Sequence, residues 1–132
     1  MKWNLILNLS LFGIAMAFAA VFGLTQHIEP LLWLIIFIFY AVIIAKKTSD
    51  KRFLHGLLVS VLNGIWIGII HASFFTTYID NNPEMRDSYE KLPHFAGPQV
   101  MVLIFGPLIG ILTGMVSGLF AYLAGKFINK KV

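Results

Sequence analysis

The placement of the charged residues constrains this chain more than any other feature of its sequence. The ten Lys and Arg and the six Asp and Glu all lie at the chain ends or in three narrow windows. The charge-free stretches between them are 3–28, 30–45, 53–79 and 92–125. A helix needs about 20 mainly apolar residues to cross a bilayer. We therefore expect an all-α, polytopic transmembrane four-helix bundle, formed as a single domain by residues 1–132.

The expected spans are about 4–24, 31–45, 53–78 and 100–125, with an outer loop over 79–99. The composition agrees, because 58% of the chain is hydrophobic and 12% is charged, against roughly a quarter charged in soluble domains. The second stretch is short, since 16 helical residues cover only about 24 Å of a roughly 30 Å hydrocarbon core. Lys46 and Lys47 can extend their side chains to the interface, so we still expect a span there.

The charges also predict the topology. If residue 1 is cytoplasmic, the inner segments hold eight of the ten basic residues and the outer segments five of the six acidic ones. This is the positive-inside pattern, so we expect both termini in the cytoplasm. In an alternative interpretation, residues 1–19 are a cleaved signal peptide and three spans remain. The apolar run continues unbroken to Leu24, which favours four spans.

Small residues recur at every fourth position in three of the expected spans. Such rows let helix backbones approach closely, which matters because lipid provides no hydrophobic force between helices. We expect the third and fourth spans to pack on each other through Gly56, Ser60, Gly64, Gly68 and Ala72 and through Gly106, Gly110, Gly114 and Gly118. A shorter row in the first span is Ala15, Ala19 and Gly23. A second face of the fourth span is a candidate contact for another subunit and consists of Thr113, Ser117, Ala121 and Gly125.

Two polar residues and a proline stand out inside the spans. Pro107 removes a backbone donor and frees the carbonyl of Leu103, which kinks a helix. His71 is expected at a similar depth on the antiparallel neighbour, so we predict that neutral His71 donates a hydrogen bond to this carbonyl. Asn63 is expected to form an interhelical hydrogen bond. Either polar side chain is also a candidate contact for a ligand or an ion.

The outer loop contains a helix signal. Asn82 is a candidate N-cap, and Pro83 suits the first position of a short helix that ends before Pro93. Met85, Tyr89 and Leu92 would share one face of this helix, which would lie over the bundle or at the membrane surface.

The absences in the sequence limit the function. No Asp, Glu, Lys or Arg occurs within a span, which argues against a proton-coupled pump or a voltage sensor. The four histidines show no metal-ligand spacing, and the sequence has neither a cysteine nor a nucleophile motif. We therefore expect no enzymatic activity, no cofactor and no metal. The basic residues are spread over the membrane-facing loops, so we expect no nucleic-acid partner.

A few residues relate the chain to a known family. They are Phe53 and Gly56 after the basic loop, Tyr78, Ile79, Asp80 and Pro83 at the outer end of the third span, and Lys126 after the glycine row. In these features and in its layout the chain resembles a bacterial family of small four-helix membrane proteins, domain of unknown function 4199. The resemblance implies a bacterial inner membrane and no assigned activity.

The leading hypothesis is a non-enzymatic membrane protein that acts through helix packing, with the lipid bilayer and either further copies of itself or another membrane protein as partners. The alternative is a homo-oligomeric channel or small-solute transporter, with Asn63, Thr113 and Ser117 as candidate lining residues. A wet face in the structure would favour this alternative. An intramembrane enzyme is the least supported class, because it needs a nucleophile paired with a base or a metal cluster.

Overall fold

The computed structural model describes residues 1–91 and 97–129, and within them every regular element is a helix. The helices are α1 (Trp3–Val21), α2 (Glu29–Lys47), α3 (Arg52–Ser73), α4 (Phe75–Asn81), α5 (Pro83–Glu90) and α6 (Pro98–Asn129). In this part of the chain, α1, α2, α3 and α6 are long and apolar enough to cross a membrane. The expected all-α class with four long apolar helices is confirmed.

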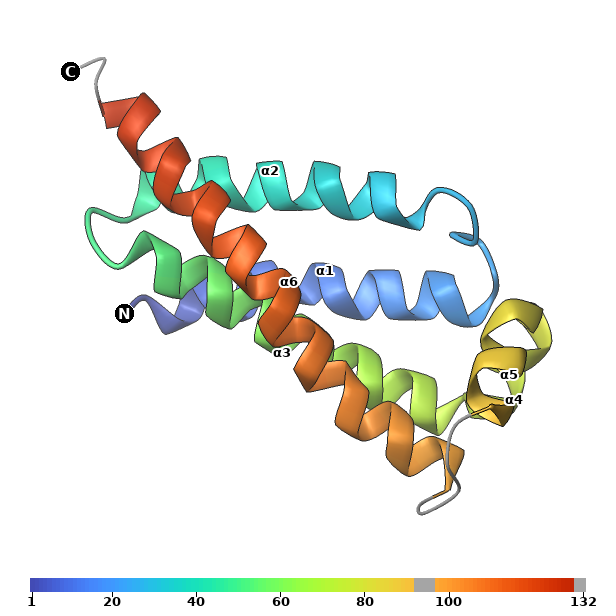
Figure 1. The fold of residues 1–132 in the computed structure, drawn as a ribbon. Helices are drawn as coiled ribbons and strands as arrows, with labels where there is room; N and C mark the ends of the chain where they lie inside the picture. Colours follow the sequence, from blue (N-terminus) through green and yellow to red (C-terminus); the bar gives the residue numbers. More distant parts are fainter. Residues whose placement is uncertain (92–96, 130–132) are drawn as a thin grey trace.

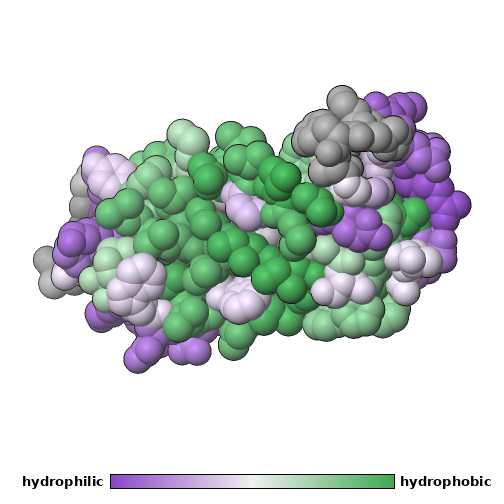
Figure 2. All heavy atoms as spheres, turned by 90° about the horizontal axis from the view of Figure 1, so that it is seen from below, coloured by the Kyte–Doolittle hydropathy of each residue, from purple (hydrophilic) through white to green (hydrophobic). Residues whose placement is uncertain are grey.

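The bundle has two distinct ends (Figure 1). One end, here called the basic end, holds the start of α1, the loop 48–51 and the end of α6. The opposite end, here called the loop end, holds the α1–α2 connection together with α4 and α5. Figure 2 shows hydrophobic residues over the middle of the molecule and hydrophilic residues gathered at its two ends. Hydrocarbon requires such an apolar belt, whereas soluble proteins rarely expose apolar patches of this size.

Two helix boundaries differ from the expected spans for local reasons. α1 stops at Val21 because Gly23, with a φ of 71°, turns the chain toward α2. α2 has 19 residues because Glu29 joins its first turn and Lys47 its last. The second span is therefore longer than the charge-free stretch predicted.

The expected third span is two helices in the structure. α3 ends at Ser73, and after Phe74 the chain continues as the short α4. The change of direction lets Tyr78 and Ile79 of α4 bury their side chains against Ala20 and Val21 at the end of α1. This packing closes part of the loop end of the bundle.

The short helix expected in the outer loop forms as α5, although Asn82 does not cap it. The Asn82 side chain instead donates hydrogen bonds to the carbonyls of Ala20 (2.7 Å) and Tyr78 (2.8 Å). Met85 and Tyr89 face the bundle and pack with the residues of α1 and α4 at the loop end. Leu92, the third residue expected on this face, lies outside the described residues.

The four long helices do not pack in sequence order. α3 packs closely on α6, α1 packs on α3, and α2 packs on α6. α1 and α2 touch mainly through aromatic rings, with Phe12 lying 5.4 Å from Phe39 and 5.9 Å from Tyr40 between ring centroids. The buried core nearer the basic end draws on all four helices and contains Ile6, Leu9, Phe37, Tyr40, Ile44, Val59 and Ala121.

α6 is much longer than the membrane is thick. Its 32 residues extend about 48 Å, against roughly 30 Å of hydrocarbon. Figure 1 shows α6 crossing the bundle obliquely, close to α2 at the basic end and away from it toward the loop end. This divergence leaves space beside α2 in the half of the bundle near the loop end.

Candidate functional site

The glycine rows of α3 and α6 lie against each other along most of the interface. A Cβ added to Gly64 would collide with the carbonyl oxygen of Gly106, and one added to Gly106 would collide with that of Gly64. A Cβ on Gly110 would lie 2.7 Å from the Ser60 carbonyl oxygen, and one on Gly56 would lie 2.8 Å from Cα of Gly118. These helices meet backbone to backbone, which only glycine allows at such a separation.

The remaining members of the expected rows have different surroundings. Gly68 is looser, because a Cβ there would meet nothing nearer than the Val102 carbonyl oxygen at 3.3 Å. Gly114 packs on Leu57, and Ala72 is half-buried near the end of α3. The row expected in the first span holds only in part, since Ala15 is exposed, whereas a Cβ on Gly23 would lie 2.8 Å from the Asn81 carbonyl oxygen. Gly13, which was not in the expected row, lies on Asn63 of α3.

The second small face of α6 is already covered within the chain. Ser117 and Ala121 are fully buried, and Gly125 is buried against the side chain of Arg52. Ala121 belongs to the core that α2 completes. The expectation that this face is left for another subunit is therefore wrong for Ser117, Ala121 and Gly125, because contacts within the chain bury them.

A cavity of about 560 Å³ lies in the half of the bundle nearer the loop end. α2 contributes one wall, α3 and α6 contribute two more, and Tyr78, Met85 and Tyr89 cover part of the loop end. The aromatic rings of Trp33, Phe37 and Phe105 make much of the lining apolar. The cavity exists because α6 diverges from α2, while large side chains fill the corresponding space at the basic end.

Three polar residues of α3 line this cavity on one helix face, Ser60, Asn63 and His71. Each is more than nine-tenths buried, with exposed fractions of 1%, 3% and 7%. Ser60 Oγ, Asn63 Oδ1 and His71 Nε2 form no hydrogen bond with any described residue. Buried polar groups are normally paired, because leaving one without a partner costs about 1–3 kcal/mol. The cavity therefore carries unfilled hydrogen-bonding capacity in an otherwise apolar setting.

Asn63 forms the interhelical hydrogen bond expected of it, and the partner is Tyr40 of α2. Its Nδ2 donates to the Tyr40 hydroxyl at 3.1 Å, which leaves Oδ1 as a free acceptor. Tyr40 is fully buried between α1 and α2. The tyrosine fixes the orientation of the amide, and its free oxygen faces Gly13 of α1, where an added Cβ would lie 2.5 Å from it.

His71 does not make the hydrogen bond predicted from Pro107. Pro107 lies inside α6 as expected, but no hydrogen bond joins His71 to Leu103 in the described structure, and Leu103 is 43% exposed on the outer face of α6. The His71 ring instead stacks on Tyr78, with 4.1 Å between ring centroids and an interplanar angle of 18°. α4 provides that tyrosine only because the third span is broken at Phe74.

The mouth of the cavity is more polar than its interior. Gln26, Glu29 and Pro30 line it at the start of α2, and Gln26 and Pro30 are exposed. The Glu29 carboxylate accepts hydrogen bonds from the Trp33 indole and the Thr25 hydroxyl, both at 3.4 Å. Burial raises the pKa of the Tyr89 phenol, so this side chain remains a neutral hydrogen-bond donor at ordinary pH.

The opposite end of the cavity is closed. Tyr40, Ile44 and Val59 are fully buried between the cavity and the basic end. Thr113, expected as a lining residue, lines the cavity at its deep end, whereas Ser117 does not reach it. The cavity is therefore closed toward the basic end.

Several important residues were not identified from the sequence. Tyr40 sits in the middle of an apolar span. Because a tyrosine hydroxyl in lipid needs a hydrogen-bond partner, the sequence could have identified Tyr40 as a buried hydrogen-bonding residue. Trp33, Phe37 and Tyr89 line the cavity because of how α2 and α5 are oriented, which no spacing in the sequence predicts.

No cluster of His, Cys, Asp or Glu that could hold a metal ion occurs in residues 1–91 and 97–129. Comparisons of the chain with protein-family models, with curated proteins and with solved structures found no match. The resemblance to domain of unknown function 4199 therefore stays a prediction.

Proposed function

We propose that this protein is a non-enzymatic integral membrane protein that binds a small, uncharged, amphipathic molecule in the cavity between α2, α3 and α6. One observation carries the proposal: the buried polar side chains of Ser60 and His71 line an apolar cavity, and Ser60 Oγ and His71 Nε2 have no hydrogen-bond partner among the described residues. Ligand pockets combine a mainly apolar lining with a few convergent polar groups. A bound molecule would supply the missing hydrogen bonds.

The polar atoms favour a ligand with a neutral head group. The free oxygen of Asn63 faces Gly13, so the polar contacts to a ligand come from Ser60 Oγ and His71 Nε2. Ser60 Oγ can donate or accept, which allows a hydroxyl to bind both residues. The lining residues inside the mouth carry no formal charge, and an ionised head group there would lack a counter-ion. The body of the ligand would lie against Trp33, Phe37 and Phe105.

The proposed orientation places the cavity entrance on the outer side of a bacterial inner membrane. The distribution of basic residues supports this, because most of them lie at the basic end, which would face the cytoplasm together with both termini. The ligand would then enter from the outer side or from the outer leaflet. Ile109 of α6 lines the cavity and is 56% exposed, so a lipid-soluble ligand has an apolar approach beside it.

Ligand binding fits the structure better than assembly through small residues. The glycine rows are used between α3 and α6, and most of the second small face is buried within the chain. The exposed face of α6 presents large side chains, among them Leu112 and Met115. A second copy would have to pack on these side chains, without the close backbone approach that small residues provide.

Photolabelling with a diazirine-bearing octanol tests the proposal. The protein is reconstituted in nanodiscs, labelled, digested and mapped by mass spectrometry. We expect saturable labelling of cavity residues such as Trp33, Met85 and Tyr89, suppressed by excess octanol but not by octanoate or octyltrimethylammonium. Ser60→Ala combined with His71→Phe should remove this labelling, because both polar contacts are lost.

A lipid-facing variant provides the control. Leu112→Phe changes a residue that is 66% exposed and does not line the cavity, so it should leave the labelling unchanged. Labelling spread over Leu112, Met115 and their neighbours, without competition by octanol, would mean that the probe only partitions into lipid. That result would refute the proposed binding site.

A further inference from the structure

A second recess lies at the basic end, remote from the cavity. It is a groove of about 720 Å³ between the start of α1 and the end of α2. Its polar lining comes from Lys2, Asn4 and Asn8 on the α1 side and from Lys46 and Lys47 on the α2 side. The groove exists because α1 and α2 pack on other helices and touch each other mainly through aromatic rings deeper in the bundle.

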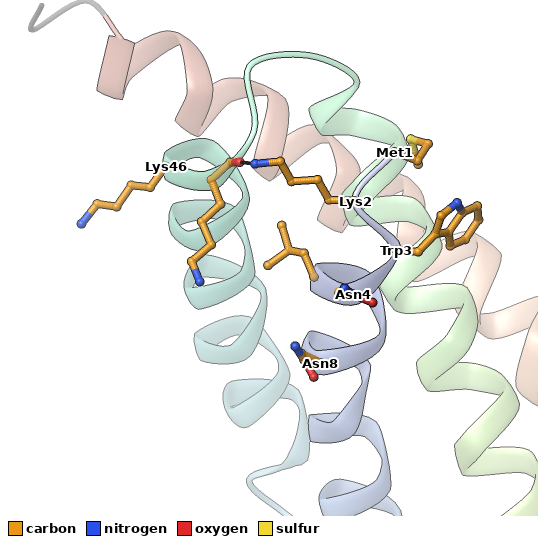
Figure 3. A pocket seen from close by; sticks show the side chains of 8 residues that line it. Met1, Lys2, Trp3, Asn4, Asn8 and Lys46 are labelled. Carbon is orange, nitrogen blue, oxygen red and sulfur yellow. Dashed lines mark hydrogen bonds between the residues drawn. The ribbon is translucent and has the colours of Figure 1, made fainter.

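The polar side chains of α1 point into this groove. Figure 3 shows Asn4 and Asn8 one above the other on the side of α1 that faces α2, and Lys2 reaching across toward the end of α2. The Lys2 ammonium donates a hydrogen bond to the Lys47 carbonyl, which links the two helix ends. Trp3 and Lys46 point away from the space between the helices (Figure 3).

Asn4 and Asn8 need partners that the described chain does not provide. Both are exposed, and neither side chain forms a hydrogen bond with a described residue. Asn8 lies about 8 Å along the helix from its first residue, which corresponds to the headgroup layer rather than bulk water. An amide at that depth is stable only with a polar partner.

The electrostatics of the groove favour an anion. Three lysines line it, and none of its described lining residues is acidic. The first turn of α1 contains no acidic residue and has no side-chain cap, so its free N–H groups add partial positive charge. The Lys2 ammonium retains two further donors after its hydrogen bond to the Lys47 carbonyl.

We propose that this groove binds the head group of an anionic phospholipid. Lys2 and Lys47 contact the phosphate, and the amides of Asn4 and Asn8 donate to phosphate or glycerol oxygens. The acyl chains continue along the apolar surface beneath, where exposed Phe12 follows Asn8 by one helical turn and packs on Phe39. A free phosphate would satisfy the lysines but would leave this apolar surface without a partner. Basic pockets between membrane helices commonly bind anionic lipid head groups.

Native mass spectrometry of lipids retained by the full chain tests the proposal. The protein is reconstituted in nanodiscs of equal parts phosphatidylcholine and phosphatidylglycerol and then released in mild detergent. We expect preferential retention of phosphatidylglycerol. Lys2→Gln with Lys47→Gln should weaken retention about thirty-fold, since each basic residue near an anionic surface contributes roughly fivefold. Asn8→Leu should weaken it roughly fivefold through loss of one hydrogen bond.

The matched control changes charge without changing the groove. Lys51→Gln with Lys126→Gln removes two charges from exposed residues at the same end that do not line the groove. It should retain phosphatidylglycerol as the unmodified chain does. If both double variants lose retention of phosphatidylglycerol equally, the retention depends only on net charge, and the proposal is overturned.

The source of the phosphate is tested separately. Excess soluble glycerol phosphate should not displace the retained lipid, because it lacks acyl chains. Complete displacement would identify a site for soluble phosphates and would overturn the lipid proposal. Equal retention of phosphatidylcholine and phosphatidylglycerol would also overturn it. Circular dichroism of each variant confirms that it is folded, and Asn8→Leu keeps the test valid if the lysine variant unfolds.

Discussion

Replacing single glycines of α3 by alanine should distinguish a glycine that touches the backbone of α6 from one that is only buried. Gly64 and Gly68 are both buried and lie about one turn apart on the helix. A Cβ on Gly64 would collide with the Gly106 carbonyl oxygen, whereas a Cβ on Gly68 would have its nearest neighbour, the Val102 carbonyl oxygen, at 3.3 Å. The two substitutions therefore differ in the contact that the added methyl group makes.

The expected magnitudes follow from this difference. Both variants gain the same helix propensity, at most about 1 kcal/mol, so that contribution cancels when they are compared. Overpacking costs about 1–3 kcal/mol, and the upper part of that range applies to Gly64→Ala because a helix backbone cannot rotate away as a side chain can. We expect Gly64→Ala to be about 2–3 kcal/mol less stable than Gly68→Ala.

The free energy of unfolding can be measured by titrating the protein in mild detergent with dodecyl sulfate, followed by circular dichroism. Gly68→Ala should unfold at or slightly above the midpoint of the unmodified chain, and Gly64→Ala well below it. If the two variants agree within about 0.5 kcal/mol, the range of ordinary surface changes, the α3–α6 separation described above is wrong.

Five further substitutions test individual contacts through the same unfolding measurement. Tyr40→Phe removes the acceptor for Asn63 Nδ2 and should cost about 1–3 kcal/mol; adding Asn63→Leu should recover part of this loss, and no recovery would argue against the pairing. Asn82→Ala removes hydrogen bonds to the carbonyls of Ala20 in α1 and Tyr78 in α4 and should cost about 1–2 kcal/mol with faster amide exchange near Ala20; unchanged exchange would contradict its role. Gly125→Ala meets the side chain of Arg52, which can shift only by disturbing its hydrogen bonds to the Thr48 carbonyl, whereas Gly118→Ala meets the Phe53 carbonyl oxygen at 2.7 Å; both should be destabilising, Gly118→Ala more so.

The long helices and the α3–α6 contact were predictable because they follow from local rules. The length of a charge-free stretch predicts a membrane helix. A row of glycines predicts that a neighbouring helix approaches closely, whichever helix that is. The break at Phe74 was not predictable in this way, because the residues after it are apolar enough to continue a helix. What ends α3 is the burial of Tyr78 and Ile79 against α1, a contact between residues distant in sequence.

The cavity is harder to predict from the sequence alone than the long helices are. Asn63 and His71 were identifiable as deep polar residues, but their surroundings depend on the oblique crossing of α6 and on the position of α4. The hydrogen bond predicted between His71 and the Leu103 carbonyl failed for this reason, since depth along two helices does not determine which faces meet. The same geometry places Tyr40 in the core and Trp33 in the lining of the cavity.

The packing order of the helices has a consequence for biosynthesis. α2 is made second, yet its main partner is α6, which the ribosome makes after the other three long helices. During synthesis, α1 and α2 would sit in the membrane as near neighbours with little backbone contact between them. The core containing Tyr40, Val59 and Ala121 can close only after the final helix has inserted. A chain truncated before α6 would therefore expose unpaired helix faces to lipid and to the quality-control proteases of the membrane.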